Sequence, residues 1–150
     1  LGAMAAPSQP SREGWLLVWL AAAVVAFAAG VIAIWRKGAR IGAPLTGPLG
    51  RRFALGSLAP VVAGAALTWG LWKSATWALM PPAWLLLYGA GVLTGGVFSI
   101  AAVRLLGVAF MALGILALLT PAAWADVWLG LGFGGLQIAC GLYIAKHHGG

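Results

Sequence analysis

The stretch AWLLLYGAGVLTGGVFSIAAVRLLGVAFMALGILALLT, residues 83–120, contains a single charged side chain, Arg104. As one straight helix it would be about 57 Å long, almost twice the thickness of the hydrocarbon core of a bilayer. Two shorter spans that turn back on each other fit a membrane better. We therefore expect helices over about 83–100 and 104–120.

The rest of the chain shares this composition. Of its 150 residues, 63% are hydrophobic and 7% are charged, whereas roughly a quarter of the residues in a soluble domain are charged. A disordered chain is excluded as well, because disordered chains are poor in apolar residues. The net charge is +7, but the basic residues lie between apolar runs. We interpret them as topology signals and not as a nucleic-acid-binding surface.

Three further apolar runs complete a prediction of five transmembrane helices in one all-α integral membrane bundle. These runs cover about 15–35, 53–72 and 127–145, and the single membrane domain spans 15–145. Pro60 lies inside the second run, where it must bend the helix or be accommodated by a neighbour. Residues 1–14 are expected to form an exposed N-terminal linker, and residues 146–150 a cytoplasmic tail.

The distribution of charge predicts the orientation of this bundle. If the basic loop 36–52 is cytoplasmic, only Arg12 and Lys73 among the basic residues lie outside, together with the acids Glu13 and Asp126. This agrees with the positive-inside rule. It places the first residue on the periplasmic side and the C-terminus in the cytoplasm.

Several segments resemble one family. They are 44–48 (PLTGP) followed by Arg51-Arg52-Phe53, 58–65 (LAPVVAGA), 84–89 (WLLLYG), 131–137 (LGFGGLQ) and 144–150 (IAKHHGG). They are similar to segments of small, uncharacterised bacterial inner-membrane proteins, and the resemblance covers most of residues 15–150. It implies a multi-pass protein of the bacterial inner membrane with a further helix upstream of Leu1. It implies no assigned activity.

Small residues mark two predicted helix-packing faces. Gly91, Gly95 and Ser99 follow one another at intervals of four, which places them on one face of a helix. The last helix carries a second face, made of Gly130, Gly134, Gln137 and Gly141. We expect contacts within the bundle, with an interface to another subunit as the alternative. Replacing Gly91, Gly95 or Gly134 by Leu should then loosen the assembly.

Gln137 is the most polar uncharged side chain deep in a predicted span. An unpaired amide in hydrocarbon costs several kcal/mol, so it should bond to another helix. Thr94, Ser99 or a carbonyl freed by Pro60 could supply the partner. A ligand-binding role for this amide is the alternative.

Tryptophans gather on the predicted outer side. They anchor the helices at the interface, or some of them line a pocket for a flat apolar ligand. The residues in question are Trp69, Trp72, Trp77, Trp84, Trp124 and Trp128.

The groups that most membrane enzymes and proton-coupled transporters use are missing from the predicted spans. No Asp, Glu, His or Lys lies there, and the serines have no His at the same depth. No zinc motif, phosphate-binding loop or CxxC is present. We expect Cys140 to be a buried hydrophobe. His147 and His148 read as a solvated tail, with metal or tetrapyrrole ligation as the alternative.

These observations favour a non-catalytic accessory or scaffolding subunit of a larger inner-membrane complex. No cofactor and no metal are expected, and its partners would be membrane lipids and other membrane subunits or a second copy. The alternative is a small protein that binds or transports a lipid, quinone or pigment. A sensor acting through loop 36–52 has only the charge of that loop in its favour, and topology already explains that charge.

Overall fold

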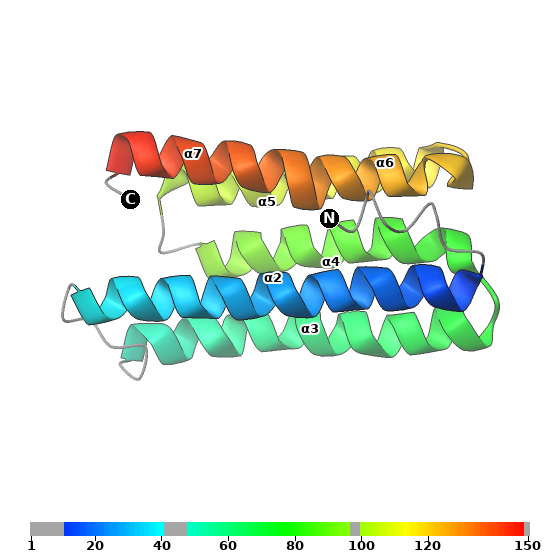
Figure 1. Cartoon of the computed structure of the whole chain (residues 1–150), viewed down its shortest axis with the longest axis horizontal. Helices are drawn as coiled ribbons and strands as arrows, with labels where there is room; N and C mark the ends of the chain where they lie inside the picture. The colour runs from blue at the N-terminus through cyan, green and yellow to red at the C-terminus, as the bar shows by residue number, and fades with distance from the viewer. Residues whose placement is uncertain (1–10, 41–47, 97–99, 149–150) are drawn as a thin grey trace. The chain divides into compact units, whose positions relative to one another are not determined.

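The computed structural model describes residues 11–40, 48–96 and 100–148, and within these ranges it contains helices and turns but no strand (Figure 1). Five long helical segments account for almost all of them. They are α2 (Arg12–Arg40), α3 (Pro48–Lys73), α4 (Met80–Gly95), α5 (Ala101–Leu119), and a last segment in which α6 (Ala125–Leu129), η5 (Gly130–Leu136) and α7 (Gln137–His148) follow one another. The predicted all-α fold is confirmed for this part of the chain.

Four of these segments are long and apolar enough to cross a membrane, which is consistent with a membrane protein. The apolar windows are Arg12–Ala29, Trp77–Gly95, Ala101–Leu119 and Ala122–His147. The predicted turn between the third and fourth helices lies between Gly95 and Ala101, with 97–99 outside the described residues. Arg104 is therefore in the first turn of α5.

The first two helices extend beyond the predicted apolar runs. The helix expected over 15–35 continues to Arg40, and the helix expected from 53 begins at Pro48. A charged residue ends an apolar span but does not end a helix, because Arg and Lys are good helix formers. The ends of the hydrophobic runs are therefore a poor guide to the ends of these helices.

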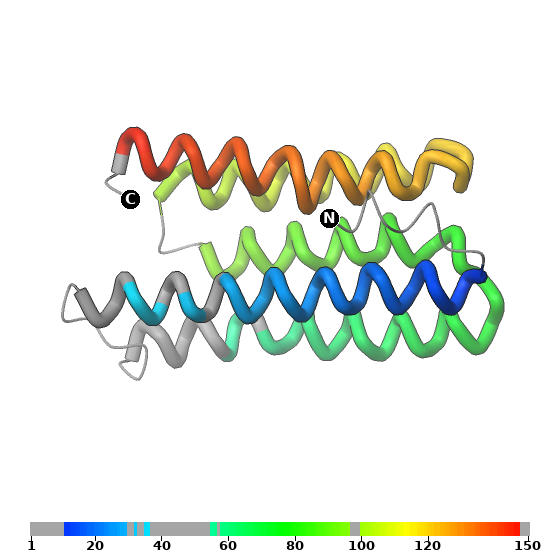
Figure 2. The backbone as a smooth tube through the Cα atoms, viewed as in Figure 1, coloured from blue at the N-terminus to red at the C-terminus, as the bar shows by residue number. Residues whose placement is uncertain are grey.

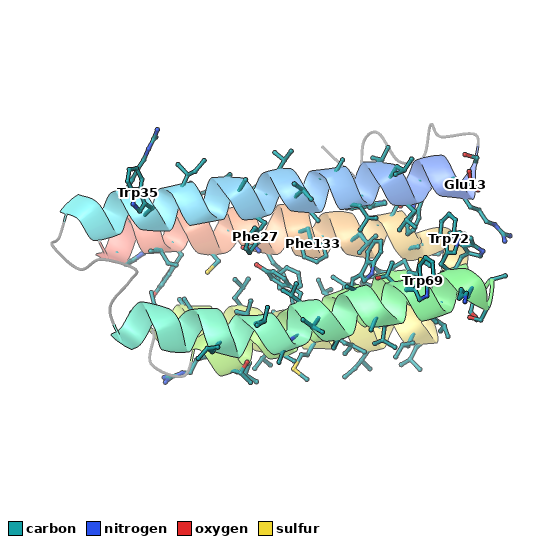
Figure 3. All side chains as sticks on the ribbon, turned by 90° about the horizontal axis from the view of Figure 1, so that it is seen from below. Glu13, Phe27, Trp35, Trp69, Trp72 and Phe133 are labelled. Carbon is teal, nitrogen blue, oxygen red and sulfur yellow. The ribbon has the colours of Figure 1, made fainter. Side chains whose placement is uncertain are left out.

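The chain divides into two compact units, 1–54 and 55–150. The first contains α2 and the start of α3. Ser11 caps α2, because its hydroxyl oxygen accepts a hydrogen bond from the Gly14 backbone N–H at 3.0 Å. Glu13 and Trp35 lie near opposite ends of this helix (Figure 3).

In the second unit, α4 and α5 approach each other so closely that glycine is required at the contact. A Cβ atom on Gly89 would lie 2.8 Å from the carbonyl oxygen of Gly107, and one on Gly107 would lie 2.8 Å from the backbone nitrogen of Leu93. Gly114 meets Leu86 in the same way, with 2.7 Å from its Cβ position to the Leu86 Cγ. These distances are shorter than any real Cβ contact, so the two helices pack backbone against backbone.

The last helical segment packs on this hairpin through another glycine. A Cβ atom on Gly132 would lie 2.7 Å from Cδ2 of Leu85 and 3.0 Å from Cε1 of Phe110. Leu85, Phe110 and Leu129 are fully buried. They form the centre of the apolar core of this unit.

Helix α3 lies against α4 along a row of residues four apart. Pro60 faces Gly91, where a Cβ atom would be 3.2 Å from the proline ring, and Gly64 faces Leu87. Helix α3 therefore continues through Pro60, because a glycine on the neighbouring helix leaves room for the proline ring.

A capped turn joins α3 to α4. The N–H of Thr76 bonds to the Leu71 carbonyl at 3.0 Å and that of Ala75 to the Trp72 carbonyl at 3.1 Å, which is the Schellman pattern. It places Ala75 at a φ of 55°, in the left-handed region that usually requires glycine.

The α4–α5 contact makes a direct prediction about stability. Gly107→Ala should destabilise the protein by about 1–3 kcal/mol, because the added methyl group overpacks two backbones. Gly70→Ala is the matched control, since nothing lies within 4 Å of its Cβ position, and it should be neutral or slightly stabilising. The measurement is reversible unfolding in detergent, followed by circular dichroism. Equal stability of the two variants would show that α4 and α5 do not touch at Gly107.

Candidate functional site

Three aromatic rings meet at the middle of the second unit, one from each of three helical segments. Tyr88 comes from α4, Phe110 from α5 and Phe133 from η5. The ring centroids lie 4.6 Å apart for Tyr88 and Phe110, 5.0 Å for Tyr88 and Phe133, and 5.1 Å for Phe110 and Phe133. All three pairs are tilted or edge-on, the arrangement that aromatic rings prefer. Phe133 is labelled in Figure 3.

A hydrogen bond between helices adjoins this ring cluster. The side-chain nitrogen Nε2 of Gln137 donates to the hydroxyl oxygen of Tyr88. The prediction that Gln137 bonds to another helix is confirmed, but the partner is none of the three expected groups. Thr94 bonds instead to carbonyls of its own helix, and Ser99 lies outside the described residues.

The π-helical segment η5 explains how Gln137 reaches Tyr88. Its seven residues, GLGFGGL, interrupt a helix that otherwise runs continuously from α6 into α7 (Figure 2). In a π-helix the backbone bonds join residues five apart, so the turn is wider than in an α-helix. Gly132 and Gln137 are five apart, and both contact residues of α4. A search at the α-helical period of 3.6 does not place these two residues on one face.

The predicted packing residues have different environments in the structure. Gly91 contacts Pro60 as described above. Gly134 and Gly141, by contrast, have no atom of another described helix of the second unit within 4 Å of their Cβ positions. Gly95 is the last residue of α4, and Gly130 is the first of η5.

The glycines at the closest contacts were missed. These are Gly89, Gly107, Gly114 and Gly132. For Gly89, Gly107 and Gly114 the sequence contains a signal. Gly107 and Gly114 are seven residues apart, as are Gly89 and Gly96, and a spacing of seven also keeps residues on one helix face.

Two of the predicted tryptophans, Trp84 and Trp128, each donate a hydrogen bond to a threonine hydroxyl, which in turn donates to a backbone carbonyl. The indole N–H of Trp84 donates to the Thr68 hydroxyl at 2.9 Å, and that hydroxyl donates to the Gly64 carbonyl at 2.7 Å. The indole N–H of Trp128 donates to the Thr120 hydroxyl at 2.7 Å, and Thr120 donates to the Leu116 carbonyl at 3.0 Å. Each connection joins a helix to the helix that follows it.

The other tryptophans of this set are packed or exposed. The rings of Trp72 and Trp77 meet edge to face, with centroids 4.4 Å apart. Trp69 is 65% exposed and lies 5.6 Å from the Lys73 ammonium nitrogen, and Trp124 is 54% exposed. Trp69 and Trp72 lie near the C-terminal end of α3 (Figure 3).

The described residues offer packing and hydrogen-bonding groups but no metal-binding cluster. Within them, no three His, Cys, Asp or Glu side chains lie close enough to hold an ion. Cys140 is a free thiol, half-buried, with its sulfur 4.0 Å from the Ala102 carbonyl oxygen. The ring of His147 stacks on Tyr143, with centroids 4.4 Å apart.

No protein-family model, curated protein or solved structure matches this chain.

The tryptophan–threonine connections predict a modest loss of stability in one pair of variants. Thr68→Val and Thr120→Val keep the shape of the side chain but remove the indole acceptor, and each should cost about 1 kcal/mol. Thr94→Val is the control, because the Thr94 hydroxyl bonds only within its own helix. Unfolding in detergent measures all three. A loss for Thr94→Val as large as for the other two would contradict a role for the indole bonds.

Proposed function

We propose that this chain is a non-catalytic, multi-pass membrane protein that acts as an accessory or scaffolding subunit of a larger inner-membrane complex. The observation that carries the proposal is an open glycine face on the last helical segment. Gly134 and Gly141 are seven residues apart, and no described residue of the second unit lies within 4 Å of their Cβ positions outside their own stretch of helix. Ile138, between them, is 64% exposed, and the adjacent Leu142 is 67% exposed.

The membrane placement is supported by an apolar exterior. On α5, Leu105 and Leu119 are 69% and 78% exposed. On α3, the expected fifth span, Leu55, Val61 and Val62 are each more than half exposed. A soluble protein of this size would hide such side chains. In lipid, exposed apolar side chains have no unfavourable free energy of solvation. We therefore propose that all five helices span the membrane.

The orientation and the compartment complete the proposal. The basic segment 36–52, which includes the end of α2 and the start of α3, and the cationic end of the last helix favour a cytoplasmic C-terminus. The proposed compartment is the bacterial inner membrane.

An open glycine face favours a protein partner over lipid. Lipid-facing positions gain nothing from glycine, which weakens a helix by roughly 0.5–1 kcal/mol relative to alanine. Helices in a membrane associate by close packing, for which small residues are needed. The other tight glycine positions of the unit, at Gly89, Gly107, Gly114 and Gly132, are filled from within. A second membrane chain would fill the open face.

The contacts of the tryptophans give less support to the alternative of a ligand-binding protein than to a structural role. The indole N–H groups of Trp84 and Trp128 are bonded to threonines, and Trp72 and Trp77 pack on each other. These contacts have a structural role, joining helices at their ends.

Substitutions on the open face test the proposal. Gly134→Leu and Gly141→Leu should reduce the amount of high-mass complex, because each adds a bulky side chain where a partner helix must approach. Neither should lower the stability of the isolated chain, since the space around each site is open. Blue-native electrophoresis of mildly solubilised membranes measures the complex. Gly70→Leu, at another open glycine, is the control. A complex that is unchanged in both Gly134→Leu and Gly141→Leu would refute the subunit role.

A further inference from the structure

The Tyr88–Gln137 pair has hydrogen-bonding capacity that the described part of the chain does not use. The Tyr88 hydroxyl oxygen accepts the bond from Gln137 Nε2. The hydroxyl proton of Tyr88 and the second amide proton of Gln137 have no acceptor among the described residues. Two donors therefore lie side by side on neighbouring helices.

These donors are accessible. Tyr88 is 36% exposed, although its ring packs on Phe110 and Phe133. Gln137 is half-buried. The rings of Phe110 and Phe133 hold the phenol ring in place.

The position along the helices places the pair far from water. Tyr88 follows Trp77, at the tryptophan-rich end of its span, by eleven residues, which is about 16 Å along a helix. A hydrocarbon core is roughly 30 Å thick, so the pair lies near its middle. Water does not satisfy polar groups there, and an unpaired donor costs several kcal/mol.

The chemistry of the acceptor follows from this depth. Ester carbonyls of phospholipids lie in the interfacial regions outside the hydrocarbon core. A carbonyl of a partner helix already accepts one bond within its own helix, and the second bonds to the Gly64 and Leu116 carbonyls come from threonines of the same helix. A lipid-soluble ring ketone satisfies both requirements, because it dissolves in the hydrocarbon and its oxygen has two lone pairs for two adjacent donors. The edges of Phe110 and Phe133 add apolar surface beside a flat ring.

We propose that Tyr88 and Gln137 form a binding site for the carbonyl oxygen of a quinone-class molecule in the membrane. Tyr88 donates its hydroxyl proton and Gln137 its free amide proton to the same oxygen. The inference rests on the membrane placement proposed above but not on the subunit role. Gln137 lies four residues before Gly141 in α7, so this site adjoins the face that carries Gly141.

The test uses the full-length chain in lipid nanodiscs, with decylubiquinone as the probe. Equilibrium binding is measured against empty nanodiscs, and the infrared carbonyl stretch of the bound probe reports hydrogen bonding to its oxygen. We expect binding above that of empty discs and a carbonyl band at lower frequency. Tyr88→Phe should weaken binding roughly tenfold and remove most of the band shift, because one donor is lost. Gln137→Leu should do the same.

Tyr143→Phe is the matched control, since Tyr143 is the other tyrosine of the chain and stacks on His147. It should bind the probe like the wild type. Tyr88→Phe keeps the ring in its cluster, and unfolding of each variant separates lost binding from lost structure. Wild-type binding no stronger than that of empty discs would overturn the proposal, as would equal binding by Tyr88→Phe and the wild type. Insertion into the discs tests the membrane placement separately, and the high-mass complex of Gly134→Leu tests the subunit role.

Discussion

The backbones of α4 and α5 touch at Gly89 and Gly107, and the other helices of the second unit pack on the hairpin that this contact defines. The contact sets the distance between the two helices, because no side chain separates them. It brings Leu85 and Phe110 together as neighbours, and Gly132 of the last segment fits against both. Helix α3 then packs on the other residues of α4, where Gly91 accommodates Pro60. The hydrophobic effect is weak between helices in lipid. The helices are therefore held together by close van der Waals packing, which glycine permits at each of these points.

Much of this fold is predictable because long apolar runs have few solutions. The stretch 83–120 is too long for one span and has to turn, and the turn lies close to its expected place. The limits of α2 and α3 are less predictable, since a charged residue ends a span without ending a helix. The tight glycines were missed for a related reason. Gly91 and Gly95 are four residues apart, but the close contacts of α5, at Gly107 and Gly114, are seven residues apart.

The polar pair shows a second limit of sequence reasoning. The physical argument that Gln137 needs a partner on another helix is general, and it is correct. The identity of the partner depends on η5, where a π turn changes which residues share a face. Nothing in a 3.6-residue period indicates that turn. The run GLGFGGL, with four glycines in seven residues, is the local feature that permits it.

The last helical segment carries the open glycines, Gly134 and Gly141, and the amide of Gln137, which bonds to Tyr88 of α4. The central claim is that this chain works in a membrane as part of a larger assembly. Native mass spectrometry of the protein extracted mildly from its own membrane tests this most directly, together with an absorption spectrum of the same sample. The account predicts stoichiometric partner chains bound to the intact protein. A lone chain that carries only a bound small molecule would contradict it.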